Sequence, residues 1–247
     1  MKECSKSIPR RLRDANFLNK YFIGHGLDIG GKPDPLDLYT ELFSRLASVR
    51  TWDREDGDAQ VLAGVADEAY DFVHSSHCLE HLDDPREGLV NWLRVVKPGG
   101  HVVVLVPDED LYEQGTFPST FNRDHRWTFT MHKTQSWSAR SINVLTLVSG
   151  LGPDVDVAKV ERLDATFRHG LPRFDQTLTP IGECAIEFVL RKRPAAEIEA
   201  GGRLPPADAH VPREHRLHLN QYRRDARTLK AQNPLTPPFT DDGPIDS

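Results

Sequence analysis

One short run constrains the fold of this chain more than any other. Residues 26–34 read Gly-Leu-Asp-Ile-Gly-Gly-Lys-Pro-Asp, an apolar segment that ends in an acid and a pair of glycines. Glycine permits a sharp turn and a close approach of the backbone to another group. Two more apolar segments follow at Ala69–His74 and His101–Val106, with a helical pattern at Pro85–Val96 between them. Strands that alternate with helices in this way predict a mostly parallel sheet with helices on both faces.

The remaining patterns complete a Rossmann-like, doubly wound α/β domain over residues 1–193. The expected strands are Gly26–Ile29, Val49–Trp52, a short Gln60–Leu62, Ala69–His74, His101–Val106, Val155–Leu163 and Cys184–Leu190. Further helices are expected over residues 36–46 and 138–149, and residues 8–22 suit a short helix or a clasp across the domain. Residues 108–137, after the fifth strand, are a polar and aromatic insert that we expect to lie over the active site. Residues 194–247 form a Pro-rich extension, in which the apolar spacing predicts a helix at 214–232.

Composition excludes several classes of protein. No apolar run approaches the ~20 residues that cross a bilayer, and the first residues lack the apolar stretch of a signal peptide. The three cysteines are too few for a disulfide framework and fit a reducing compartment. The formal net charge of −6 disfavours a nucleic-acid partner. We therefore expect a cytoplasmic protein with a small-molecule partner and no membrane association. The sequence leaves the oligomeric state open, and a homodimer is one alternative.

Polar segments follow the predicted strands where a ligand would bind. Gly30-Gly31 follows the first strand, Asp53 and then Asp58-Ala59 follow the second, and His74-Ser-Ser-His77 with Glu80-His81 ends the fourth. In order and spacing, these segments resemble the class I S-adenosylmethionine (SAM)-dependent methyltransferases, specifically the methyltransferase type 11 group. The resemblance covers about residues 20–193. Lys32 stands where that family usually has a second glycine.

The resemblance implies SAM as the cofactor and assigns its contacts. Asp53 would accept hydrogen bonds from the ribose hydroxyls, as the acid after the second strand does in dinucleotide-binding folds. Asp58 would accept from the adenine amino group, while the backbone of Ala59 donates. The other cofactor-binding residues that we expect are Asp28, Gly30, Gly31, Ser75 and Ser76.

Three mechanisms of methyl transfer stay open. The sulfonium is already a strong electrophile, so alignment with the nucleophile can be sufficient. A hydroxyl nucleophile also gains from a base with a pKa near the working pH, for which the catalytic candidates are His77 and His125. In the third mechanism, a divalent metal binds the substrate oxygen and lowers its pKa. Its ligands would be His77, Glu80, His81 and His125, a pattern that resembles the metal set of small-RNA 2′-O-methyltransferases.

The acceptor is expected to be a small molecule, and the reaction O-methylation of a hydroxyl, with a sugar or glycoconjugate among the acceptors considered. Three alternatives remain. One is an N- or C-methyltransferase of a biosynthetic pathway, and another is an RNA methyltransferase. The third is a non-catalytic binding protein that keeps the fold.

Overall fold

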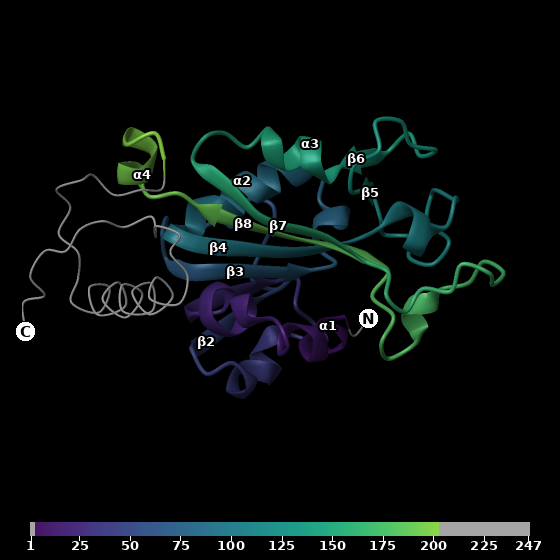
Figure 1. Cartoon of the computed structure of the whole chain (residues 1–247), viewed down its shortest axis with the longest axis horizontal. Coiled ribbons are helices and arrows are strands. Elements are labelled where there is room, and N and C mark those ends of the chain that lie inside the picture. Colours follow the sequence, from purple (N-terminus) through teal and green to yellow (C-terminus); the bar gives the residue numbers. More distant parts are fainter. Residues whose placement is uncertain (1–2, 203–247) are drawn as a thin grey trace, which may run out of the picture. The chain divides into compact units, whose positions relative to one another are not determined.

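A computed structural model of the chain describes residues 3–202, and the described residues up to Glu199 form one compact unit. Within this part of the chain, six strands form one sheet in the order β2-β1-β3-β4-β8-β7 (Figure 1). Four of them run parallel: β1 (Gly24–Ile29), β2 (Leu46–Trp52), β3 (Tyr70–Ser76) and β4 (Val96–Pro107). The other two, β7 (Val155–Leu163) and β8 (Ala185–Lys192), pair antiparallel with each other, and β8 is antiparallel to β4. This mixed sheet confirms the Rossmann-like α/β fold.

Helices cover both faces of the sheet (Figure 1). One face packs against α2 (Pro85–Val95) and α3 (Val144–Ser149), with Trp92 and Leu89 of α2 wholly buried. The other face packs against α1 (Cys4–Arg11) and the chain that follows it, including a 3₁₀ helix at Leu36–Leu42. β4 lies between these layers, so its run from Val102 to Val106 is buried throughout, as is typical of a central parallel strand.

The bounds of α2 follow from local chemistry. The Asp84 side chain accepts hydrogen bonds from the backbone N–H groups of Arg86 and Glu87, and Pro85 occupies the first helical position. Beyond the helix the chain enters β4 directly. Because β3 runs parallel to β1, its polar carboxyl end lies at the same edge of the sheet as the end of β1.

A small parallel pair of strands, β5 (Thr128–Thr130) and β6 (Ser141–Asn143), lies within and just after the insert. It shortens the helix expected over residues 138–149. Residues 141–143 pair with β5, and the helix begins only at Val144, where the Asn143 side chain accepts from the N–H of Thr146. Ser138 does not cap this helix, and its hydroxyl instead accepts from the N–H of Arg140 (3.2 Å).

Other predicted elements also differ. Residues 60–62 form turns rather than the expected strand, because the backbone N–H of Leu62 bonds to the carbonyl of Asp58 and that of Val65 to Leu62. The helix expected over 36–46 is a 3₁₀ helix that ends at Leu42. In place of one helix over 8–22, α1 starts earlier and a π-helical turn follows at Phe17–Tyr21.

After β8 the chain forms the short helix α4 (Ala195–Glu199). The helix predicted at 214–232 lies outside the described residues. In the described part of the chain, the helices are all too short or too polar to cross a membrane.

Candidate active site

The turn after β1 is built around two glycines. Gly30 has a φ of +71°, and its N–H donates to the carbonyl of Trp52 at the end of β2 (2.8 Å). A Cβ on Gly30 would lie 2.7 Å from Cβ of Cys78, and one on Gly31 would lie 2.4 Å from Oδ2 of Asp28. Only glycine therefore fits at either position, and the backbone of this turn stays open to a ligand at the carboxyl edge of the sheet.

One cavity of about 550 Å³ opens beside this turn. Its volume lies in the range of small-molecule sites. Asp53, Asp58 and Ala59 line it together with the apolar side chains of Trp52 and Leu82. The Asp53 carboxylate is held at the rim because it accepts from the backbone N–H groups of Lys32 (3.1 Å) and Arg54 (2.8 Å). Each of its oxygens keeps a further lone pair for a ligand.

A second cavity, of about 260 Å³, adjoins the first and shares Gly30, Lys32, Arg54, His77 and His81 with it. Its walls are mostly polar. The residues that line only this cavity include Glu3, Asp28, Gly31, Ser76, Asn122, Asp124 and His125. The last three come from the insert after β4, so this segment forms part of the wall opposite the sheet.

The floor of the second cavity is a buried acid–histidine pair. Oδ1 of Asp28 lies 2.6 Å from Nδ1 of His74, and Oδ2 accepts from the N–H of Leu36 (2.7 Å). Burial lowers the pKa of His74 and outweighs the opposing effect of the Asp28 carboxylate. Both oxygens of Asp28 therefore have partners within the protein, and the carboxylate lies directly beside Gly31 of the turn.

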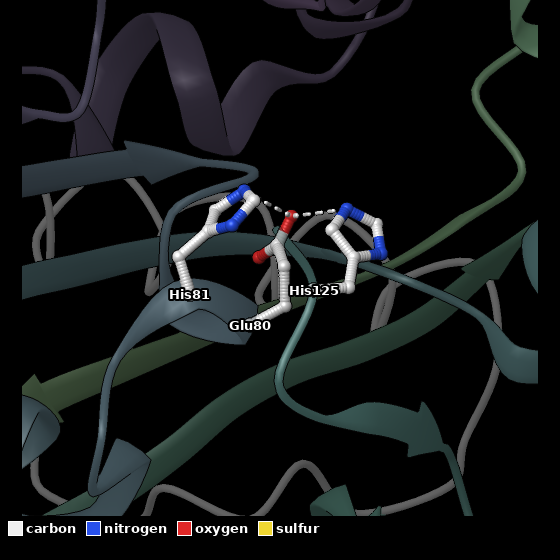
Figure 2. Close-up of side chains that lie close together, drawn as sticks. All are labelled: Glu80, His81 and His125. Atoms are coloured by element: carbon white, nitrogen blue, oxygen red, sulfur yellow. Dashed lines mark ion pairs between the residues drawn. The ribbon is translucent and has the colours of Figure 1, made fainter. Parts of the chain in front are cut away.

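A cluster of three imidazoles surrounds the carboxylate of Glu80. Oε1 of Glu80 lies 3.4 Å from Nδ1 of His77, 3.9 Å from Nε2 of His81 and 3.8 Å from Nε2 of His125. Figure 2 shows the rings of His81 and His125 on either side of this oxygen. Glu80 is wholly buried, which raises the pKa of its carboxyl, but the surrounding imidazoles outweigh this effect and lower the pKa to about 2.

His77 stands between the two cavities. Burial lowers the pKa of this imidazole, but Glu80 and Glu3 outweigh burial and raise it. Its Nε2 lies 3.9 Å from a carboxylate oxygen of Glu3 and has no hydrogen-bond partner among the described residues. His77 therefore lines both cavities and keeps one ring nitrogen without a hydrogen bond to the described residues.

Most of the residues that the sequence singled out meet at this edge. Asp28, Gly31, Ser76 and His125 line the small cavity, Asp53, Asp58 and Ala59 line the large one, and Gly30, His77 and His81 line both. Ser75 and Glu80 are the exceptions, since they line neither cavity. The buried hydroxyl of Ser75 donates to the carbonyl of Ile29 (3.1 Å). Glu80 lies behind the cavity wall, next to the imidazoles.

Sequence reasoning missed two acids that shape the site. Glu113 accepts a hydrogen bond from Nδ1 of His125 (2.7 Å), and Glu3 approaches His77 from α1's side of the sheet. No motif or spacing marks either residue, because the tertiary packing of the insert and of the N-terminal segment places both.

Comparison with known proteins identifies the class. The model of a methyltransferase domain family matches residues 14–151, which is more than half of the chain. The chain therefore belongs to this family and is a SAM-dependent methyltransferase with the class I fold. No curated protein sequence matches it.

Solved structures with a related fold are distant in sequence. A SAM-dependent methyltransferase of Thermotoga maritima is 20% identical, with a TM-score of 0.42 over 74% of this chain and 88% of that one. A Haloferax volcanii protein solved with the Trm112 methyltransferase activator is 12% identical, with a TM-score of 0.47 over 76% and 90%. Phosphoethanolamine N-methyltransferase 2 of Haemonchus contortus, solved with phosphomonomethylethanolamine and S-adenosylhomocysteine, is 15% identical, with a TM-score of 0.46 over 75% and 52%.

Proposed function

We propose that this enzyme methylates a hydroxyl oxygen of a small, uncharged or cationic acceptor. The observation that carries the proposal is the small polar cavity lined by imidazoles beside the glycine turn. Its volume of about 260 Å³ suits a compact acceptor or one end of a larger one. A sugar hydroxyl meets these requirements.

The larger cavity fits SAM. Gly30 lines both cavities and Gly31 lines the small one, which supports close packing of the methionine part against this backbone. The carboxylate of Asp53 would accept hydrogen bonds from the ribose hydroxyls. Asp58 and Ala59 line the part of the cavity that would take the adenine. Ser76 lines the adjoining cavity, and its buried hydroxyl, which has no partner among the described residues, would donate to the cofactor or the acceptor.

Methyl transfer requires the protein to align the acceptor oxygen with the methyl group and to remove one proton. SAM supplies a methyl group on a sulfonium. A lone pair of the acceptor oxygen forms the new C–O bond, the C–S bond breaks, and its electron pair stays on sulfur. The hydroxyl proton goes to a base, a role that suits His77 because this residue lines both cavities and its Nε2 has no hydrogen-bond partner among the described residues. His125 is held more firmly, since Glu113 fixes its Nδ1.

The charge of the small cavity favours neutral or cationic acceptors. The carboxylates of Glu3, Asp34 and Asp124 outnumber the cations Lys32 and Arg54 in its lining. An anionic acceptor would meet net repulsion there. The same acids support a second candidate, N-methylation of an amine, in which a carboxylate would hold the ammonium group before it loses its proton.

The test is a search for the labelled product. Purified enzyme is incubated with trideuteriomethyl SAM and a small-molecule extract, and mass spectrometry then identifies the product that gains the label. Fragmentation assigns the methylated atom. A methyl ether made by the native enzyme, and made far more slowly by His77→Ala, supports the proposal. His132→Ala is the matched control, because this exposed histidine lies in the insert but not in the cavity lining.

Two results would contradict the proposal. A label on nitrogen would establish the amine alternative. A protein that binds SAM in calorimetry but labels nothing across several extracts would be the non-catalytic binding protein of this fold.

A further inference from the structure

The Glu80 cluster has the spacing of a metal site. One ligand atom from each of Glu80, His81 and His125 lies within 4.8 Å of the others. Two ligands that each lie ~2.1 Å from a tetrahedral ion are ~3.4 Å apart. The distances from Oε1 of Glu80 to the two imidazoles, 3.9 and 3.8 Å, exceed that value only slightly. Small side-chain rotations would therefore close the cluster around an ion (Figure 2).

The outer partners of the two imidazoles fix which nitrogen faces inward. Nδ1 of His81 lies 3.0 Å from the backbone carbonyl of Asp124, which can only accept, so this nitrogen carries the proton. Nδ1 of His125 lies 2.7 Å from the carboxylate of Glu113, which sets the same tautomer. Metal-binding histidines almost always donate their second N–H to a carboxylate or a carbonyl in this way.

With this tautomer, the side chains of the cluster do not satisfy one another's hydrogen-bonding groups. In a neutral imidazole whose Nδ1 is protonated, Nε2 presents a lone pair. Two such lone pairs face a wholly buried carboxylate, and neither oxygen of Glu80 has a hydrogen-bond partner among the described residues. His77 approaches the carboxylate with its Nδ1 at 3.4 Å, but it leaves the inward nitrogens of His81 and His125 without a donor. A cation between the three groups would satisfy all of them at once.

We propose that Glu80, His81 and His125 bind a divalent metal ion of the kind that imidazole ligands favour, such as Zn²⁺, Mn²⁺ or Fe²⁺. Two imidazoles and one carboxylate leave coordination positions open, as in catalytic zinc and non-haem iron sites. His81 and His125 line the small cavity, so the open positions would face the acceptor. Mg²⁺ and Ca²⁺ prefer sites made of oxygen ligands.

The role of the ion rests on the proposed function, although the binding site does not. A hydroxyl oxygen coordinated at an open position would lose its proton more readily. His77 lies beside the cluster and would receive that proton. The substrate class narrows accordingly to acceptors whose hydroxyl can act as a ligand, and a neighbouring second oxygen would strengthen the binding.

The experiment measures metal binding without SAM or acceptor. Full-length protein stripped with a chelator is titrated with Co²⁺, followed by its absorption spectrum, and with Zn²⁺ in competition with a chromogenic chelator. We expect one equivalent of each ion to bind, with nitrogen ligation in the Co²⁺ spectrum. Glu80→Gln and His125→Ala should abolish binding. Glu113→Gln should weaken it by about 10- to 100-fold, as the loss of an outer partner typically does.

Two further variants keep the result interpretable. His81 is partly exposed, so His81→Ala should remain folded and lose the ion even if a buried replacement unfolds the chain. His132→Ala should bind like the native protein. Absence of binding to stripped native protein, or binding that survives both Glu80→Gln and His81→Ala, overturns the proposal. Methyl transfer at an undiminished rate in stripped protein would overturn only the role on the acceptor, and loss of SAM binding would leave the metal result intact.

Discussion

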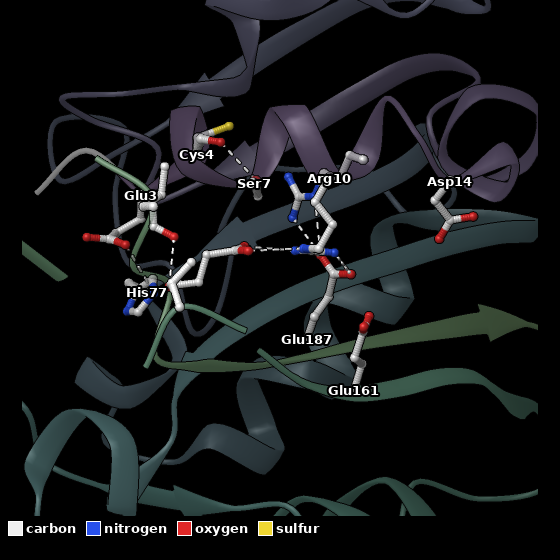
Figure 3. A network of polar contacts seen from close by, with 12 residues as sticks. Glu3, Cys4, Ser7, Arg10, Asp14, His77, Glu161 and Glu187 are labelled. Carbon is white, nitrogen blue, oxygen red and sulfur yellow. Dashed lines mark hydrogen bonds and ion pairs between the residues drawn. The ribbon is translucent and has the colours of Figure 1, made fainter. Parts of the chain in front are cut away.

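Nη2 of Arg11 lies 3.1 Å from Oε2 of Glu187, and both side chains are wholly buried. This pair joins α1 to β8, which lie 176 residues apart in the sequence at this contact. Nη1 of Arg11 also lies 3.0 Å from Nε2 of His74, whose other nitrogen contacts Asp28. Polar contacts therefore run without a break from α1 through the sheet to the acid beneath the glycine turn. Figure 3 shows Arg10 of α1 reaching the same Glu187.

Removing the charge of Glu187 should strongly destabilise the fold. Glu187→Gln leaves the buried guanidinium of Arg11 without its anion, a change that costs about 3–5 kcal/mol in comparable buried pairs. The free energy of unfolding, measured by urea titration, should fall by that amount. Glu161→Gln is the control, because this acid pairs with Lys159 at the surface and should contribute less than about 1 kcal/mol. Similar losses in both variants would contradict the importance of burial here.

The glycine turn should tolerate no side chain at Gly30. Gly30 and Gly99 both have positive φ, so alanine at either position introduces backbone strain of about 1–2 kcal/mol. Only at Gly30 would the new Cβ also collide, since Gly99 has open space around it. Isothermal titration calorimetry should show SAM affinity reduced at least ~10-fold in Gly30→Ala, a loss of about 1.4 kcal/mol, and unchanged in Gly99→Ala. Equal affinities would mean that the cofactor does not pack against this turn.

The carboxylate of Asp53 should contribute to SAM affinity. Hydrogen bonds to a charged group are worth about 1.5–3 kcal/mol, so Asp53→Asn should weaken SAM binding by roughly 10- to 100-fold. Stability should change little, because the side chain is only half-buried. Asp67→Asn, at an exposed acid paired with Arg94, should leave SAM binding unaltered. An unchanged dissociation constant for Asp53→Asn would remove this acid from the cofactor site.

The sequence predicted those parts of the fold whose signals are local. The apolar run of β4 and the helix that starts at Pro85 depend on neighbouring residues alone, and both were confirmed. The strand expected at residues 60–62 was wrong because strand formation depends on contacts beyond the neighbouring residues. A strand needs a partner, and the bonding of this segment is taken up by local turns and by α2, where Trp92 donates to the carbonyl of Ala59.

The site was predictable to a similar extent. Motif spacing predicted Gly30, Asp53, His77 and His125 as site residues. In the structure, all four lie in the lining of the two cavities. The spacing gave no sign of Glu113, because that carboxylate meets His125 only through the folding of the insert. Ser75 shows the reverse case, since it belongs to the predicted segment but lines neither cavity, and its hydroxyl donates to the carbonyl of Ile29.

His101 should make stability fall as the pH falls. Its side chain packs 5.1 Å from the ring of Tyr21, and burial, assisted by Lys20 and Arg191, lowers its pKa from 6.5 to about 4. At a pH between these two values, His101 binds a proton in the unfolded chain but not in the folded protein. The free energy of unfolding therefore decreases on acidification. Below pH 4 both states are protonated and the contribution stops changing. The full effect is about 3 kcal/mol.

A variant isolates this effect from the other groups that titrate in the same range. His101→Phe keeps an aromatic ring against Tyr21 but cannot bind a proton, so its stability should change less between pH 6.5 and 4 than that of the native protein. Asp108, whose pKa burial raises to about 6, is present in both proteins, and its contribution therefore cancels in the difference. Urea midpoints at several pH values provide the measurement. His132→Phe, at an exposed site, should retain the native slope, and parallel profiles for the native protein and His101→Phe would show that His101 titrates alike in both states.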